Sequence, residues 1–418
     1  MADELQRICV VGLGYVGVPT AAMLASKGLD VVGVDVEPAR VAAVNAGAPH
    51  IDEPGLEALV RNAVGRGGLH AQLEVPAADA FIIAVPTPLD CKQKPDLQHL
   101  RDAVASVARV LVPGNLVVVE STSPVGTTEA ACAWLAEVRP ALSFPHLAGE
   151  QSDIRVAYSP ERVLPGNILF ELVNNDRVVG GVTPACAQAA SSMYRLFVQG
   201  ECALTTARTA ELVKLTENAF RDVNLAFANE ISQVCDALDI SPWQVIELAN
   251  RHPRVDLLRP GPGVGGHCVA VDPWFLIHAA PRLTPLVQAA RQVNDDRPQW
   301  VVDRVLSASE GLANPKVACL GLAYKANVSD LRESPAMRIV DRLELELPGT
   351  VLVVDPHIAS LPDEFEGRRV ELVNRDEALG VADIIIVLTD HREFLDIERD
   401  RLANKRLIDT RGLWDGWD

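Results

Sequence analysis

Apolar residues in the first third of the chain gather in short runs separated by helical stretches. The runs that predict strands are Ile8–Val11, Leu29–Asp35, Ala80–Val85, Leu116–Glu120 and Val156–Ser159. Each run is continuous rather than alternating, which is typical of strands that are covered on both faces. Strands of this kind that alternate with helices predict a doubly wound parallel sheet.

From about Thr205 to Asn250 the pattern changes to that of long helix. Apolar residues recur there at helical spacing, and no strand signal interrupts them. A loop rich in arginine, proline and glycine follows from Asn250 to Asp272, and further helix extends to about Gly311. The middle of the chain is therefore predicted to be helical.

The last segment returns to strand–helix alternation. Its predicted strands are Val317–Leu320, Val351–Val354, Ile384–Leu388 and Leu407–Ile408. The predicted fold class is α/β, with two Rossmann-like doubly wound lobes joined by a central helical region. The expected domains are residues 1–203, 204–312 and 313–418. We find no short tandem repeat, and the two lobes are alike only in style.

Composition narrows the class of protein. The 418 residues are too many for a single ordinary core, and 48% hydrophobic with 22% charged residues is ordinary globular composition. A net charge of −18 argues against nucleic-acid binding, which needs clustered positive charge. No apolar run is long enough to span a membrane, and the first residues lack the features of a signal peptide.

Cysteine usage indicates the compartment. The 8 cysteines are scattered without a C-x-x-C pair, which is typical of a reducing compartment and of a protein without structural zinc. We therefore expect a cytoplasmic protein that binds no metal.

The stretch Gly12–Gly17 is a G-x-G-x-x-G motif that follows one apolar strand and opens a helix. The three glycines allow the tight turn, the close approach of a pyrophosphate to Gly14 and the close packing of helix on strand. Asp35 ends the next strand, where a carboxylate accepts hydrogen bonds from the adenosine ribose and repels a 2′-phosphate. NAD is thus favoured over NADP, although Arg40 nearby would tolerate that phosphate. Tyr15 and Val16 belong to the same loop.

Small hydroxyl residues follow two later strands, with Thr87 after one and Ser121 and Thr122 after the other. Ligands of open α/β sheets bind at these carboxyl ends, so the three residues are candidate cofactor contacts. Clusters of Ser, Thr and Pro also simply end strands.

Two further features carry candidate chemistry. Lys214, Asn218 and Arg221 recur at helical spacing and share one face of a predicted helix, Glu211–Glu230. Such faces are usually only solvated, but asparagine is a poor helix former. Cys268 stands in the glycine-rich stretch 261–274, where a flexible backbone can present a thiol to a ligand. A thiolate there would attack an aldehyde. The other seven cysteines are interpreted as buried apolar residues.

Together, Gly12–Gly17, Asp35, Ser159–Glu161, Lys214 with Asn218, and Gly263–Asp272 resemble the UDP-glucose/GDP-mannose dehydrogenase family, in order and over nearly the whole chain. The resemblance implies an NAD lobe, a central dimerisation region and a C-terminal lobe that helps to bind the nucleotide. It also implies two successive hydride transfers to NAD by way of a thioester, and a homodimer or higher homo-oligomer.

The resemblance assigns roles to six catalytic candidates. Cys268 would be the nucleophile, Lys214 and Asn218 would hold the oxyanion, Asp272 and Thr122 would position water, and Glu161 would assist thioester hydrolysis. Whether Lys214 acts as base or as cation stays open. The residues implied for the sugar and phosphates are Arg162, Val163, Lys214, Asn218, Arg221, His252, Arg254, Gly265, Tyr324, Lys325, Arg332 and Arg411. Arg332 is implied for NAD as well, and His252 and Arg254 for the partner subunit's site.

Four further motifs resemble the branch of this family that oxidises UDP-N-acetyl-D-mannosamine. They are 159–166, 174–178, 249–255 and 331–337. Members that act on UDP-glucose usually carry an acid where this chain has Pro165, which favours 2-acetamido sugars. UDP-N-acetylglucosamine and UDP-glucose remain alternatives. A simple two-electron dehydrogenase would not need Cys268, and a sugar-nucleotide-binding protein without turnover would not need Cys268 and Lys214 together.

Overall fold

The computed structural model describes residues 5–51, 53–266 and 268–414. It divides into two compact units, which are described separately. One comprises Met1–Glu217 and Trp274–Ala279, and the other comprises Asn218–Pro273 and Ala280–Asp418. One boundary lies within the helix α9 (Ala207–Ala237), and the other two stand on either side of Trp274–Ala279.

The first unit is built on an eight-stranded sheet with the order β3-β2-β1-β4-β5-β6-β7-β8. Its strands are β1 (Arg7–Val11), β2 (Asp30–Val34), β3 (Leu69–Gln72), β4 (Ala80–Ile83), β5 (Leu116–Val119), β6 (Arg155–Tyr158), β7 (Arg177–Gly181) and β8 (Cys202–Thr206). Its helices are α1 (Gly17–Ser26), α2 (Pro38–Asn45), α3 (Leu56–Gly65), α4 (Gln98–Ala108), α5 (Thr127–Val138), α6 (Pro145–Ala148), η2 (Gly149–Gln151), α7 (Ile168–Asn174) and α8 (Pro184–Tyr194).

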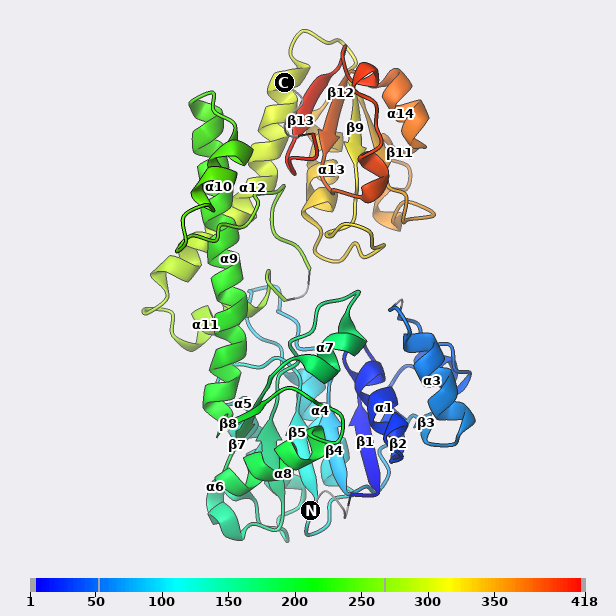
Figure 1. The fold of residues 1–418 in the computed structure, drawn as a ribbon, viewed down its shortest axis with the longest axis vertical. Coiled ribbons are helices and arrows are strands. Elements are labelled where there is room, and N and C mark those ends of the chain that lie inside the picture. Colours follow the sequence, from blue (N-terminus) through cyan, green and yellow to red (C-terminus); the bar gives the residue numbers. More distant parts are fainter. Residues whose placement is uncertain (1–4, 52, 267, 415–418) are drawn as a thin grey trace. The chain divides into compact units, whose positions relative to one another are not determined.

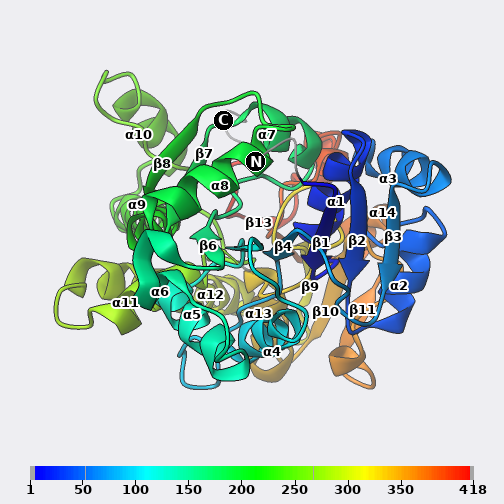
Figure 2. The same cartoon turned by 90° about the horizontal axis from the view of Figure 1, so that it is seen from below.

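Helices cover both faces of this sheet (Figure 2). One buried cluster joins the sheet to α1, α3, α7 and α8, and a second joins its other face to α4 and α5. The strands β4 and β5 are completely buried, which explains why their sequences are continuously apolar.

The five strands predicted for this unit are present, but three others were missed. The edge strands β3 and β8 expose part of their side chains, and β7 contains an arginine and two glycines, so none has a continuous apolar run. The prediction of a parallel sheet is also wrong in one place, because β7 runs antiparallel to β6.

The central part is helical (Figure 1), with α9, α10 (Pro242–Ala249), α11 (Asp272–Ala279) and α12 (Pro285–Ser309). The predicted uninterrupted helix from Thr205 to Asn250 is wrong at both ends of α9. Thr205 and Thr206 belong to β8. After α9 the chain turns at Asp239, whose φ of 55° ends the helix. The Ser241 side chain then caps α10.

The C-terminal lobe is a five-stranded parallel sheet with the order β11-β10-β9-β12-β13. Its elements are β9 (Lys316–Leu320), α13 (Pro335–Glu346), β10 (Thr350–Val354), η3 (Asp363–Phe365), β11 (Val370–Leu372), α14 (Arg375–Val381), β12 (Ile384–Val387), η4 (Arg392–Phe394), η5 (Arg399–Arg401) and β13 (Arg406–Asp409). The four predicted strands are present. The three-residue edge strand β11 was not predicted.

The two sheets share a strand order and a glycine hydrogen bond. The interpretation that the two lobes are alike only in style is therefore wrong. The order β11-β10-β9-β12-β13 repeats the order β3-β2-β1-β4-β5. Gly12 N–H donates to Val34 O at 2.8 Å, and Gly321 N–H donates to Val354 O at the same distance. No described helix is long and apolar enough to cross a membrane.

Candidate active site

The glycine loop after β1 leaves no room for side chains at two of its glycines. A Cβ on Gly12, whose φ is 98°, would lie 2.5 Å from Ala84 O, and a Cβ on Gly17 would lie 1.7 Å from Gly12 O. A Cβ on Gly14 would meet no atom of the described residues within 4 Å. The loop is therefore closed at its two ends and open at Gly14, where a bound pyrophosphate needs bare backbone.

The N-terminus of α1 is available to an anion. Among the described residues, no side chain caps this end of the helix, whose N-cap residue is Val16. Unpaired N–H groups and the helix dipole favour a phosphate group at such a position. The open cradle at Gly14 and the uncapped helix fit the diphosphate of NAD, and Tyr15 and Val16 lie between them in the chain.

Asp35 holds the same loop. Its Oδ2 accepts the N–H of Leu13 at 2.8 Å and lies 3.5 Å from Arg40 Nη1, and its Oδ1 accepts the N–H of Glu37 at 3.0 Å. The carboxyl is almost fully buried. Asp35 is thus a structural part of the glycine loop, beyond the ribose contact that the sequence predicts, and Arg40 is paired with it.

The hydroxyl residues after β4 and β5 tie the two strand ends together. Thr87 Oγ1 donates to Thr122 O at 2.6 Å, and Ser121 Oγ donates to Val85 O at 2.7 Å. Thr87 and Thr122 remain partly exposed, whereas Ser121 is buried. All three lie at the carboxyl edge of the sheet, where Thr87 follows β4, the neighbour of β1, and Ser121 and Thr122 follow β5, the neighbour of β4.

The cysteine loop of the second unit is held at both ends by α9. At its start, Asn229 Oδ1 accepts the N–H of Gly261 at 2.9 Å, and Arg297 Nε donates to Gly261 O at 2.9 Å. At its end, Asn218 Nδ2 donates to Asp272 Oδ2. Between these points Cys268 is exposed. His267 lies outside the described residues.

The glycines of this loop pack directly on residues that come after β9. A Cβ on Gly266 would lie 2.8 Å from the Tyr324 ring, and one on Gly265 would lie 2.7 Å from Glu333 O. A Cβ on Gly263 would lie 2.9 Å from Pro335. Larger residues at these positions would push the loop away, so the glycines fix the position of Cys268 within its unit.

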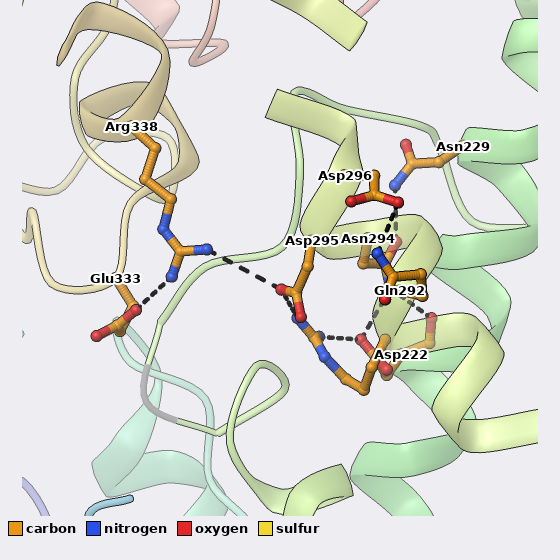
Figure 3. A network of polar contacts seen from close by, with 9 residues as sticks. Asp222, Asn229, Gln292, Asn294, Asp295, Asp296, Glu333 and Arg338 are labelled. Atoms are coloured by element: carbon orange, nitrogen blue, oxygen red, sulfur yellow. Dashed lines mark hydrogen bonds and ion pairs between the residues drawn. The ribbon is translucent and has the colours of Figure 1, made fainter. Parts of the chain in front are cut away.

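Buried polar residues of α9 and α12 form hydrogen bonds with one another, within the network of polar contacts drawn in Figure 3. Arg291 Nη1 donates to Asp222 Oδ1 at 2.5 Å, and Asn294 Nδ2 donates to the same oxygen at 2.8 Å. Asn229 Nδ2 donates to Asn294 Oδ1 at 2.9 Å, which links the network to Gly261. Burial raises the pKa of Asp222 to about 6, although Arg291 opposes the shift.

Residues of α9 at the predicted site differ in exposure. Lys214 and Asn218 are both 8% exposed, whereas Arg221 is exposed. Their spacing places Lys214 and Asn218 one turn apart on the same face of the helix. A buried lysine and a buried asparagine on one face are unusual in a surface helix and support the predicted roles.

Glu161 comes after β6 and is held from two sides. Its Oε2 accepts Arg177 Nη2 at 2.6 Å, and its Oε1 accepts the backbone N–H of Arg162 at 2.7 Å. The sequence motifs did not single out Arg177 as a site residue. The only signal was its place in the motif 174–178.

Several predicted substrate residues are paired with acids in this structure. Arg162 pairs with Glu217 at 2.7 Å, Arg411 pairs with Asp390 at 2.7 Å, and Arg332 pairs with Asp330. Val163 packs against the core of the first unit. His252 and Arg254 are exposed after α10, and Lys325 is partly exposed after β9.

One group of possible metal ligands occurs among the described residues, namely His357, His391 and Glu393. His391 Nδ1 accepts the N–H of Asn327 at 2.9 Å, so its Nε2 carries the proton in the neutral ring and lies 3.3 Å from Asp355 Oδ2. Both ring nitrogens are therefore occupied by hydrogen bonds. A metal ion would have to displace one of these two hydrogen bonds to bind His391.

Comparison with known proteins assigns the family. Residues 6–198, 208–296 and 318–416 match, in turn, the NAD binding, central and UDP binding domains of the UDP-glucose/GDP-mannose dehydrogenase family. The chain belongs to this family. The sequence-based prediction of the family and of NAD as the cofactor is confirmed, and the protein is an NAD-dependent UDP-sugar dehydrogenase.

Individual relatives differ in the sugar that they name. The NDP-N-acetyl-D-galactosaminuronic acid dehydrogenase of Ralstonia nicotianae is 55% identical over 411 residues, which cover 98% of this chain and 97% of that protein. The UDP-N-acetyl-D-mannosamine dehydrogenase of Campylobacter jejuni is 51% identical over 404 residues, 96% of this chain and 99% of that protein. The solved UDP-D-ManNAc dehydrogenase of Pyrococcus horikoshii has a TM-score of 0.90 at 37% identity, covering 98% of this chain and 96% of that chain.

Proposed function

We propose that this protein oxidises the C6 alcohol of UDP-N-acetyl-D-mannosamine to the acid in two steps, through a thioester on Cys268. The observation that carries the mechanism is the loop around Cys268. Its glycines are packed against neighbouring residues, its two ends are bound to α9, and Cys268 is an exposed residue. A packing cysteine would need none of these features.

The proposed reaction proceeds through an aldehyde and a thioester. The alcohol loses a hydride and a proton to give the aldehyde, and the Cys268 thiol adds to that aldehyde to form a thiohemiacetal. A second hydride and the hydroxyl proton are lost to give the thioester, and water then breaks the carbon–sulfur bond to release the carboxylate, a proton and the thiol. NAD supplies the hydride acceptor at both oxidations, so two NADH form for each sugar.

Lys214 and Asn218 are proposed to stabilise the negative oxygen that forms at the reacting carbon. An amide nitrogen has two donor hydrogens, and Asp272 accepts one of those of Asn218. The other is proposed to donate to the oxyanion. Removing one such donor typically costs about 3–4 kcal/mol of transition-state stabilisation. Asp272, which orients the amide, is proposed to position water together with Thr122.

Glu161 is proposed to take the proton from the water that attacks the thioester. A carboxylate has about four lone-pair positions, and the hydrogen bonds from Arg162 and Arg177 to Glu161 leave others for water. The phosphates and sugar would be bound by the predicted basic residues. The ion pairs of Arg162, Arg332 and Arg411 would have to exchange acid partners for the ligand.

We also propose that the domains span residues 1–203, 204–312 and 313–418.

We further propose that the protein forms a homodimer through α9. The buried face of this helix carries Glu211, Asn218, Asp222 and Asn229, whereas the opposite face exposes Phe220, Phe227 and Val234. Phe220 is 66% exposed. A helix that buries its polar face and exposes its aromatic face is typical of an interface. His252 and Arg254 would then reach the partner's site.

The sugar is proposed from two observations. Members that act on UDP-glucose usually carry an acid at position 165, and Pro165 has neither its charge nor its backbone N–H donor. The less polar loop after Glu161 suits an N-acetyl group better than a hydroxyl. The relative from Campylobacter jejuni, 51% identical, is named for UDP-N-acetyl-D-mannosamine. A nucleotide-linked N-acetyl-D-galactosamine is the second candidate, because the relative from Ralstonia nicotianae is 55% identical.

A panel of sugar nucleotides tests the proposed substrate, with NADH absorbance as the readout. We expect kcat/KM for UDP-N-acetyl-D-mannosamine to exceed that for UDP-glucose at least about tenfold, which corresponds to about 1.4 kcal/mol. P165E should narrow this difference, and P165A is the matched control without added charge. Parity, or a preference for UDP-glucose, would defeat the proposal. A preference for UDP-N-acetyl-D-galactosamine would select the second candidate.

A further inference from the structure

Arg177 lies between two carboxylates inside the first unit. Its Nη2 donates to Glu161 Oε2 at 2.6 Å, and its Nη1 donates to Glu120 Oε1 at 2.9 Å. The guanidinium is 5% exposed, and the Glu120 carboxyl is completely buried. Glu120 directly precedes Ser121 and Thr122 at the end of β5, whereas Arg177 begins β7.

An aromatic residue completes this cluster. The Tyr194 hydroxyl donates to Glu120 Oε1 at 2.6 Å, and the Arg177 guanidinium lies 4.2 Å from the centre of the Tyr194 ring. The planar guanidinium is thus fixed by an acid at each end and by a ring against its face. Such a residue has little freedom to rotate.

The charges explain why this arginine stays ionised. Burial lowers the pKa of Arg177, but the charges of Glu161 and Glu120 outweigh burial and raise it above its ordinary value. Burial raises the pKa of Glu120, and Arg177 opposes that shift. The cluster thus contains the carboxylates of Glu120 and Glu161 and the guanidinium of Arg177. The charge of Arg177 offsets the free-energy cost of burying the Glu161 carboxylate.

Space for water adjoins this arrangement. A cavity of about 10 Å³ is lined by residues that include Glu161, Arg162, Asp176 and Arg177. That volume is near the minimum that holds one water molecule. The Glu161 carboxyl itself is 9% exposed.

We propose that Arg177 is a positioning residue for thioester hydrolysis. It fixes the Glu161 carboxylate in one orientation, so that an oxygen lone pair can take a proton from the attacking water. This inference rests on the proposed role of Glu161. Arg177 itself takes no part in either oxidation, so its loss should slow only the last step.

R177K keeps the charge but cannot bridge two carboxylates in a plane. Rapid mixing of this variant with NAD and the sugar nucleotide should give a burst of two NADH per site at the wild-type rate. Steady turnover should then be about 10- to 100-fold slower than in the wild type, the loss expected from a misplaced group. Mass spectrometry of the acid-quenched enzyme should find Cys268 acylated.

Y194F is the matched control. It removes a hydrogen bond from the same buried cluster but leaves both bonds of Arg177 to Glu161 and Glu120. We expect it to turn over like the wild type without accumulating acyl-enzyme. If R177K does not fold, R177M/E120M replaces a buried ion pair by apolar groups of similar volume, which proteins often tolerate. The same burst and the same acylated Cys268 are expected.

E161Q distinguishes the role of Glu161 from that of Arg177. If E161Q turns over at the wild-type rate, the proposed role of Glu161 is wrong. If E161Q accumulates acyl-enzyme and the Arg177 variant does not, only the positioning role is overturned. A slowed burst in R177K, with no acyl-enzyme, would also contradict it, because Arg177 would then act before hydrolysis.

Discussion

The two sheets of this protein begin in the same way and diverge after the first glycine. Leu13 N–H donates to Asp35 at 2.8 Å in one lobe, and Leu322 N–H donates to Asp355 at 2.7 Å in the other. The same carboxyls accept from Glu37 at 3.0 Å and from His357 at 2.9 Å. Strand order, glycine and acid are thus shared.

The segments after this shared glycine differ between the lobes. In the N-terminal lobe, no atom in the described part of the chain would lie within 4 Å of a Cβ on Gly14, and no side chain there caps α1, which begins at Gly17. At the position of Gly14 the C-terminal lobe has Ala323, which is buried and whose carbonyl accepts Thr389 Oγ1 at 2.6 Å. There α13 starts only at Pro335, and the Ser334 side chain caps it.

This difference shows which parts of a Rossmann-like lobe make a dinucleotide site. The sheet, the glycine turn and the acid support the loop in both lobes. Only an open glycine beside an uncapped helix provides the anion site. The C-terminal lobe uses its long loop differently, because Tyr324 and Pro335 support the cysteine loop.

The largest expected effect concerns the thiol of Cys268, which lies in the cysteine loop and in neither sheet. Buried cysteines in both sheets have a raised pKa, about 12 for Cys9 and for Cys319, because burial disfavours the thiolate. C268S should lower turnover at least about a thousandfold, as expected when a nucleophile is removed. C319A should change stability but not kcat. Wild-type rates in C268S would assign this thiol to packing.

G14A gives the N-terminal lobe the residue type that the C-terminal lobe has at the equivalent position, Ala323. Because a Cβ on Gly14 would meet no atom of the described residues within 4 Å, the variant should fold normally. NAD affinity should fall at least about tenfold, about 1.4 kcal/mol, because the Cβ occupies the approach of the pyrophosphate. Titration calorimetry with NAD measures this, and A323G is the control that should not alter it. Unchanged affinity in G14A would mean that Gly14 is not the point of approach.

D35A and D355A form a matched pair. D35A removes the acceptor of two backbone N–H groups and D355A that of three, so each should lower the free energy of unfolding by at least about 1–3 kcal/mol. Only D35A should reduce the preference for NAD over NADP, which kcat/KM with the two cofactors reports. If D355A altered that preference as well, or if the wild type used both cofactors equally, the assignment of Asp35 would fail.

The smallest expected effect is the contribution of Asp355, the acid of the C-terminal lobe, to the pH dependence of stability. Burial raises the pKa of Asp355, but hydrogen bonds from His391, Leu322 and His357 outweigh burial and hold it below its ordinary value. A lowered pKa adds stability above the unfolded value of 3.8 that is lost as pH falls. As the pH is lowered from about 5 to about 3, the melting temperature of D355N should therefore fall less steeply than that of the wild type. Parallel curves for D355N and wild type would exclude this contribution.

Continuous apolar runs were enough to predict the central strands, because burial on both faces demands them. Edge strands such as β3 and β11 expose part of their side chains and carry no such run. The likeness of the two lobes was missed because it resides in backbone hydrogen bonds to Asp35 and Asp355, and few side chains need to match for these to form.

The candidate site shows the same limit. Motifs within one stretch of chain identified the glycine loop, the cysteine loop and the face of α9. The bonds of Arg177 to Glu161 and Glu120 join residues 16 and 57 positions apart, and those of Asn229 to Gly261 join residues 32 apart. No local spacing predicts such pairs, because they depend on how strands and helices pack.

The stoichiometry of NADH to sugar tests the thioester mechanism most directly. With UDP-N-acetyl-D-mannosamine limiting and NAD in excess, the reaction taken to completion should give two NADH for each sugar consumed, and a carbonyl-trapping reagent should detect no free aldehyde. One NADH per sugar together with released aldehyde would contradict a reaction in which Cys268 holds the intermediate until it is an acid.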